Sequence, residues 1–254
     1  MLLEYLTRSW EMYRKNAMSF IIAELLSLVI TGIIAFIGVG IILVSIGISS
    51  LTNLSDPEFV ITKIVSVLPF LAELSTALIF FIIAGIVWAF LKTGIYGMAA
   101  ESLRGVTKFE TMFSVAKNSG FKGIISSVIV GVITVILFLV IIIGLNIFFP
   151  IIGGIIGMIL FFLLVITFSL FFSGIVVDDL GSVQTIKESF NITKKNYLEI
   201  LGLMFLYTVI SLVVTIIPSM INIFFSVVGI LVYCFVIEPM MKISLVFFYK
   251  RNKV

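Results

Sequence analysis

Glu24 and Glu238 are carboxylates that lie well inside long apolar runs of the sequence. A charge in the middle of a bilayer costs about 2.5–3.5 kcal/mol, so such side chains usually face a partner or a water-filled cavity. Lys242 follows Glu238 by one helical turn, in the order that favours an ion pair. Glu24, Glu238 and Lys242 therefore form a candidate intramembrane polar site. It is a cation or proton site, an anchor for a polar headgroup, or an internal ion pair between helices.

A second set of candidate residues recurs along the chain as Lys15-Asn16, Lys117-Asn118 and Lys195-Asn196. Each pair closes a charged segment, and each segment precedes a pair of apolar stretches. These lysines could contact anionic lipid headgroups, where each basic residue contributes about 1 kcal/mol. Alternatively, the pairs mark a repeated structural hinge, because asparagine can satisfy backbone groups at a bend.

Residues with the potential for metal binding or catalysis are few. Asp178-Asp179 looks like half of an acidic metal motif, but no further carboxylate follows at helical spacing, and acids before a helix are stabilising on their own. The sequence has no histidine, the commonest metal ligand and general acid or base. It also has no nucleophile–base pair and no phosphate-binding glycine loop. We therefore expect no enzymatic activity, no metal or cofactor, and no binding of nucleic acid.

The elements that position these residues are membrane helices by composition. Of the 254 residues, 61% are hydrophobic and 11% are charged, against roughly 45–50% and 25% in an ordinary soluble domain. Runs of about 18 or more nearly uncharged residues are typical of transmembrane helices. The sequence predicts an all-α polytopic membrane protein with six transmembrane helices.

The predicted spans cover about residues 18–50, 74–91, 121–149, 151–177, 198–217 and 222–249, and Pro150 and Pro218 end the third and fifth. They form three helix pairs, each preceded by a cytoplasmic amphipathic helix. Within one membrane domain, residues 1–254, this predicts internal repeats at roughly 1–104, 105–179 and 180–254. The first amphipathic segment, residues 2–16, is either a helix in the headgroup plane or the first turns of the first span.

Three short motifs add detail. Asp56-Pro57-Glu58 predicts a helix start between the first two spans, and Asn53-Leu54-Ser55 is a glycosylation sequon. Gly153 and Gly157 have a spacing that allows close approach of helices, within the chain or between two copies.

The distribution of charge predicts the orientation. If the N-terminus is cytoplasmic, only Lys63 of the 16 basic residues faces outward. Loops rich in lysine and arginine stay on the cytoplasmic side of a membrane. We therefore predict a multi-pass protein of the cytoplasmic (cell) membrane with both termini in the cytoplasm.

The segments that contain Ser189-Phe190 and Lys194-Lys195-Asn196 resemble a Ser-Trp…Lys-x-Asn-Phe signature of certain six-helix prokaryotic membrane proteins. Ser9-Trp10 and Lys15-Asn16 match the same signature, and the closing IEPMMKISLVFFYKRNK is similar to that group's ending. The group includes the membrane domain that accompanies some glycerophosphodiester phosphodiesterases, and families of unknown function. Since no catalytic domain is expected in this chain, the resemblance implies the six-helix architecture and no activity.

Together these observations predict a non-enzymatic integral membrane protein that interacts with lipids or with partner membrane proteins at the cytoplasmic face. The alternative is a transporter or channel for a small solute or an ion, with its polar site around Glu24, Glu238 and Lys242. The predicted repeats all start on the cytoplasmic side, whereas many transporters are built from inverted repeats.

Overall fold

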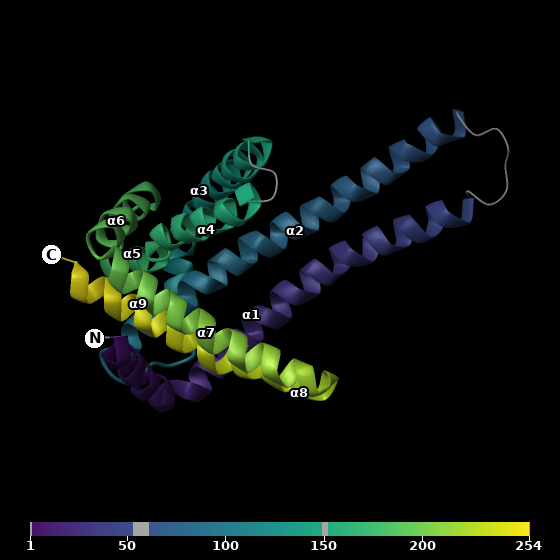
Figure 1. Ribbon diagram of the computed structural model, residues 1–254. Coiled ribbons are helices and arrows are strands. Elements are labelled where there is room, and N and C mark those ends of the chain that lie inside the picture. The colour runs from purple at the N-terminus through teal and green to yellow at the C-terminus, as the bar shows by residue number, and fades with distance from the viewer. Residues whose placement is uncertain (1, 53–60, 149–151, 254) are drawn as a thin grey trace. The chain divides into compact units, whose positions relative to one another are not determined.

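The structure, a computed structural model, describes residues 2–52, 61–148 and 152–253, and every regular element in these ranges is helical (Figure 1). The helices are α1 (Leu2–Thr52), α2 (Ile61–Ser102), α3 (Glu110–Phe148), α4 (Ile152–Thr167), α5 (Phe171–Asp178), α6 (Ser182–Lys195), α7 (Tyr197–Ile221), α8 (Ile223–Val232) and α9 (Glu238–Asn252). A π-helical turn, η1 (Tyr233–Ile237), joins α8 to α9.

Six stretches of the described residues are long and apolar enough to cross a membrane. They are Leu2–Val44, Leu74–Ser102, Glu110–Leu145, Gly153–Asp178, Tyr197–Ile221 and Ile223–Asn252. Many large apolar side chains on these helices are exposed, such as Phe36, Val140 and Leu212, which is expected of a surface that faces lipid rather than water. For the described residues, the predictions of an all-helical fold and of six membrane-length helices are confirmed.

The chain divides into two compact units, the first made of residues 1–25 and 89–254 and the second of Leu26–Trp88. The second unit consists of the C-terminal part of α1 and the N-terminal part of α2. These two helices pack closely at Gly38, where an added Cβ would lie 3.3 Å from the Ala77 carbonyl oxygen and from Phe80 Cβ. All the candidate site residues belong to the first unit.

In the first unit, the N-terminal turns of α1 pack against α9, which brings the two ends of the described chain together (Figure 1). The buried Tyr5 ring lies 5.3 Å from the Phe247 ring and 5.8 Å from the Phe248 ring, centroid to centroid. Arg251 donates a hydrogen bond of 2.9 Å to Glu4. Residues 2–16 are thus the first turns of α1, with no break before the apolar run.

The other two charged segments differ in structure. Residues 107–119 run from the α2–α3 loop directly into α3, whereas residues 183–195 belong to the separate helix α6. The backbone N–H of Asn196 closes α6 by donating to the carbonyls of Ile192 and Thr193, at 3.1 and 3.2 Å. The threefold repeat of helix pairs stays a prediction.

The predicted fourth span is divided into α4 and α5 by a turn at residues 168–170. Ser189 of α6 fills this break, since its hydroxyl accepts from the Leu170 N–H at 3.2 Å and donates to the Thr167 carbonyl at 3.0 Å. Thr185 of α6 donates to the Phe171 carbonyl at 2.7 Å. A neighbouring helix therefore replaces the backbone hydrogen bonds that the break removes, which hydrophobic periodicity alone does not reveal.

The prediction that Pro218 ends the fifth span is wrong, because α7 continues through it to Ile221. Proline has no N–H, so the Val214 carbonyl lacks its usual helical donor. Gly229 of α8 packs against that carbonyl and the Pro218 ring. Asn222 makes the turn between α7 and α8. Its side-chain oxygen accepts a hydrogen bond from the Phe225 backbone N–H at 3.1 Å.

The sequon at Asn53, the helix start at residues 56–58 and the turn at Pro150 lie outside the described residues. Gly153 and Gly157 are buried in α4. The ring centroids of Phe138 in α3 and Phe161 in α4 lie 5.1 Å apart. This contact between α3 and α4 supports packing within the chain at that part of α4.

Candidate functional site

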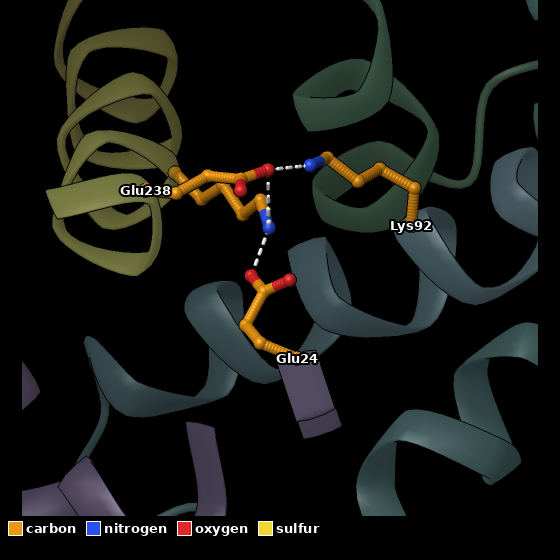
Figure 2. Close-up of polar contacts among 4 residues, drawn as sticks. Glu24, Lys92 and Glu238 are labelled. Carbon is orange, nitrogen blue, oxygen red and sulfur yellow. Dashed lines mark hydrogen bonds and ion pairs between the residues drawn. The ribbon is translucent and has the colours of Figure 1, made fainter. Parts of the chain in front are cut away.

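Four charged side chains from three helices meet inside the first unit (Figure 2). Lys242 of α9 forms ion pairs with Glu24 of α1 and, at 3.2 Å, with Glu238 of its own helix. Glu238 forms a further ion pair with Lys92 of α2. The charges alternate in sign along this chain of contacts, and the charge cluster of Glu24, Lys92, Glu238 and Lys242 is formally neutral.

The charge cluster is largely removed from solvent. The exposed fractions of the side chains are 0% for Lys242, 8% for Glu24, 11% for Lys92 and 18% for Glu238. Burying a single ion in a protein costs several kcal/mol, and pairing with hydrogen-bonded counter-ions offsets this cost. Each acid in the cluster has a basic partner and each base has an acidic one. The pairing therefore offsets the free-energy cost of burying these charges.

Glu238 sits where the last helix changes its winding. The π turn η1 directly precedes it, and Pro239 follows it in the first turn of α9. A π turn widens the helix by one residue and redirects the side chains that come after it, and such turns are frequent at functional sites. Because Pro239 cannot donate a backbone hydrogen bond, the regular pattern of α-helical bonds is also interrupted here. From this position Glu238 pairs with Lys92 and with Lys242 on the next turn.

The structure brings together all three residues of the predicted polar site and adds a fourth. The count of basic residues places Lys92 on the cytoplasmic side, at or below the membrane interface, and does not predict its part in the cluster. The charges in the sequence do indicate that a residue is missing from the predicted site. Glu24 and Glu238 lie inside apolar runs and need two basic partners, and Lys242 supplies one of them. Lys92 lies within the candidate span Leu74–Ser102 and provides the other.

The repeated Lys-Asn pairs are not alike in structure. Lys15, Lys117 and Lys195 are all exposed. Of the asparagines, Asn16 is buried within α1 and Asn118 is exposed within α3, while the partly exposed Asn196 follows α6. The feature that the three pairs share is therefore the exposed lysine.

Asn16 has a distinct structural role, because it holds the loop between α2 and α3. Its side-chain nitrogen donates to the Met12 carbonyl at 2.8 Å and to the Gly105 carbonyl at 3.3 Å. Its side-chain oxygen accepts from the Thr107 backbone N–H at 2.7 Å. The Ser19 hydroxyl, one turn further along α1, donates to the Thr107 carbonyl at 3.2 Å. These bonds fix the path of a short loop that would otherwise expose its backbone.

Asp178 and Asp179 are engaged with other groups of the chain. Tyr249 donates its hydroxyl to Asp178 at 2.6 Å, and Lys253 forms an ion pair with the same carboxylate at 2.6 Å. Lys122 pairs with Asp179 at 2.6 Å, and this ammonium lowers the pKa of the Asp179 carboxyl. Within the described ranges, no group of three or more His, Cys, Asp or Glu residues could hold a metal ion.

Comparison with known proteins gives a family for the chain. Neither a curated protein nor a solved structure matches it. A family model, described as a domain of unknown function (DUF7847), matches residues 68–248, which is more than two thirds of the chain. The matched part includes Lys92, Glu238 and Lys242, while Glu24 precedes it. The chain therefore belongs to the family described as domain of unknown function DUF7847.

Proposed function

We propose that this protein is a non-enzymatic, multi-pass protein of the cytoplasmic membrane that binds anionic lipids at its cytoplasmic face. The observation that carries the proposal is the exposure of Lys15, Lys117 and Lys195. Lys15 and Lys117 lie in the N-terminal parts of two candidate membrane helices, and Lys195 lies just before a third. A basic residue near an anionic membrane surface contributes about 1 kcal/mol of attraction. Three such residues would favour anionic over neutral lipids around the protein.

The proposal includes the arrangement that the sequence predicts. Both termini lie in the cytoplasm, and three helix pairs each follow a charged segment. The resemblance to the membrane domain that accompanies some glycerophosphodiester phosphodiesterases supports this architecture and adds no activity. Partner membrane proteins are the second class of contact that the exposed lysines could make.

The charge cluster bears on the alternative of a transporter or channel. A transport site needs charged groups that water and the solute can reach. In the cluster, each charge has a partner, and Lys242, at its centre, is fully buried. This pairing favours a structural role for Glu24, Glu238 and Lys242, in which they tie the helices of the first unit together.

The test is lipid retention by the purified protein, measured by native mass spectrometry after extraction from membranes that contain phosphatidylglycerol and phosphatidylcholine. Reversal of Lys15, Lys117 and Lys195 to glutamate should lower the ratio of retained phosphatidylglycerol to phosphatidylcholine by about tenfold or more. The matched control replaces the same lysines with arginine, which keeps the charge.

An unchanged ratio after charge reversal would refute lipid binding by these residues. If instead a specific protein is lost from the purified complex while the lipid ratio is unchanged, the exposed lysines bind a partner protein.

A further inference from the structure

A pocket of about 480 Å³ lies in the first unit where four of the candidate membrane spans end. Its walls come from the last turns of α2, the loop that follows, the first turns of α3, and the ends of α5 and α9. The charge cluster does not line it. Its charged lining consists of Glu101, Arg104, Lys108, Glu110 and Lys250. We call this the polar pocket.

The basic residues of the polar pocket are available to a ligand. The ion pairs among the described residues involve Lys92, Lys122, Lys242, Arg251 and Lys253, and none of them includes Arg104, Lys108 or Lys250. Three positive charges converging on one cavity without carboxylate partners repel one another, so an anion that enters the cavity relieves this repulsion.

The acidic residues of the pocket differ from the basic ones in their contacts. One carboxylate oxygen of Glu101 accepts from the hydroxyls of Thr107 and Thr111, each at 2.6 Å. Glu101 therefore also organises the loop that carries Arg104 and Lys108. With Glu110, the lining has three positive and two negative side chains, which leaves a formal excess of one positive charge.

The loop that presents Arg104 and Lys108 is fixed in advance. Asn16 bonds to Gly105 and Thr107, which lie between the two basic residues, and Gly105 adopts a positive φ of 155° that favours glycine. Ordering a flexible loop around a ligand would cost free energy, so a loop that is already held in place binds more tightly.

We propose that the polar pocket binds a phosphodiester group, which carries one negative charge and so balances the excess charge of the lining. Arg104 suits this role because a guanidinium can donate two parallel hydrogen bonds to phosphate oxygens, and Lys108 and Lys250 add point charges. The proposal rests on the proposed function in one respect: if the candidate helices span the bilayer, their ends lie at the depth of lipid phosphates. The phosphodiester can belong to a lipid headgroup or to a soluble molecule.

The test uses the full-length protein in detergent with two probes, phosphatidylglycerol and the soluble phosphodiester dimethyl phosphate. Binding is measured by native mass spectrometry for the lipid and by broadening of the phosphorus NMR signal for both probes. Arg104→Gln and Lys250→Gln should each weaken binding by about tenfold. Lys187→Gln, an exposed lysine of α6 outside the pocket, is the matched control and should leave binding unchanged.

A second variant guards against misfolding. Ser114 lines the pocket from the exposed side of α3, so Ser114→Phe fills the cavity and keeps every charge. It should also abolish binding, while circular dichroism and gel filtration match the parent protein. Binding that survives both the Arg104→Gln/Lys250→Gln double substitution and Ser114→Phe would overturn the proposal, as would a parent protein that binds neither probe.

The two probes distinguish the source of the phosphodiester. Binding of phosphatidylglycerol alone assigns the pocket to a lipid headgroup, and binding of dimethyl phosphate as well assigns it to the phosphodiester group itself. Reversal of Lys15, Lys117 and Lys195 should leave binding of dimethyl phosphate unchanged, because none of them lines the cavity. A result that refutes lipid binding by the surface lysines therefore does not refute phosphodiester binding in the polar pocket, and the reverse also holds.

Discussion

Glu24 and Lys242 are 218 positions apart in the sequence and form an ion pair inside the first unit. Through Lys242 the contact extends to Glu238 at 3.2 Å, and through Glu238 to Lys92. One chain of alternating charges thus joins α1, α2 and α9. Hydrophobic association between helices is weak in lipid, because lipid tails are as apolar as the side chains, so polar contacts of this kind take on a larger share of specificity.

Lys242→Met should destabilise the protein strongly. Lys242 is fully buried and is the direct partner of both Glu24 and Glu238, so its removal leaves Glu24 without its ion pair. Breaking a buried pair on one side costs about 3–5 kcal/mol. For a chain of this size we expect the midpoint of thermal unfolding in detergent to fall by on the order of 10 °C. Circular dichroism against temperature measures the shift.

The control for this substitution is Lys187→Met, which removes an exposed lysine of α6 and should cost little. Adding Glu24→Gln to Lys242→Met removes the orphaned charge, so the double variant should be more stable than Lys242→Met alone. If Lys242→Met proves as stable as Lys187→Met, the charge cluster contributes nothing to the fold.

The parts of the fold that follow from composition could be predicted from the sequence. Long apolar runs dictate membrane-length helices, and Glu24, Glu238 and Lys242 stood out because charges are costly in such runs. Lys92 could have been found by requiring charge balance. Its position near the end of an apolar run made the membrane interface an equally good place for it, and only the tertiary structure brings it to Glu238.

The breaks within the spans could not be predicted in the same way. The turn between α4 and α5 depends on Ser189, a residue of another helix, so no local pattern marks it. Pro218 was expected to end a helix, but Gly229 allows α8 to pack against the Val214 carbonyl that the proline leaves free. In both places a residue of another helix contacts the backbone where the regular bonding is interrupted.

Ser189→Ala should destabilise the junction of α4, α5 and α6. The substitution removes both bonds of the hydroxyl and leaves the buried Leu170 N–H without its Ser189 acceptor. An unsatisfied buried polar group costs about 1–3 kcal/mol. Hydrogen exchange followed by mass spectrometry should show faster exchange at residues 168–172.

Gln184→Ala, at an exposed position of the same helix, is the matched control and should leave exchange at the break unchanged. Equal exchange in Ser189→Ala and Gln184→Ala would show that the hydroxyl does not stabilise the turn.

Asn16→Ala should release the α2–α3 loop, whereas Asn118→Ala should not. Both asparagines follow a lysine in a charged segment, but Asn16 is buried and bonded to Gly105 and Thr107, and Asn118 is exposed on α3. Loss of the Asn16 amide leaves the buried Thr107 N–H unpaired, which costs about 1–3 kcal/mol.

Trypsin can cut after Arg104 and Lys108 in this loop, and the rate of cleavage follows the population of the opened loop. Cleavage there should therefore accelerate by about tenfold in Asn16→Ala. Equal cleavage rates in the two variants would mean that the repeated asparagines act alike, as a shared hinge would require, and that Asn16 does not hold the loop.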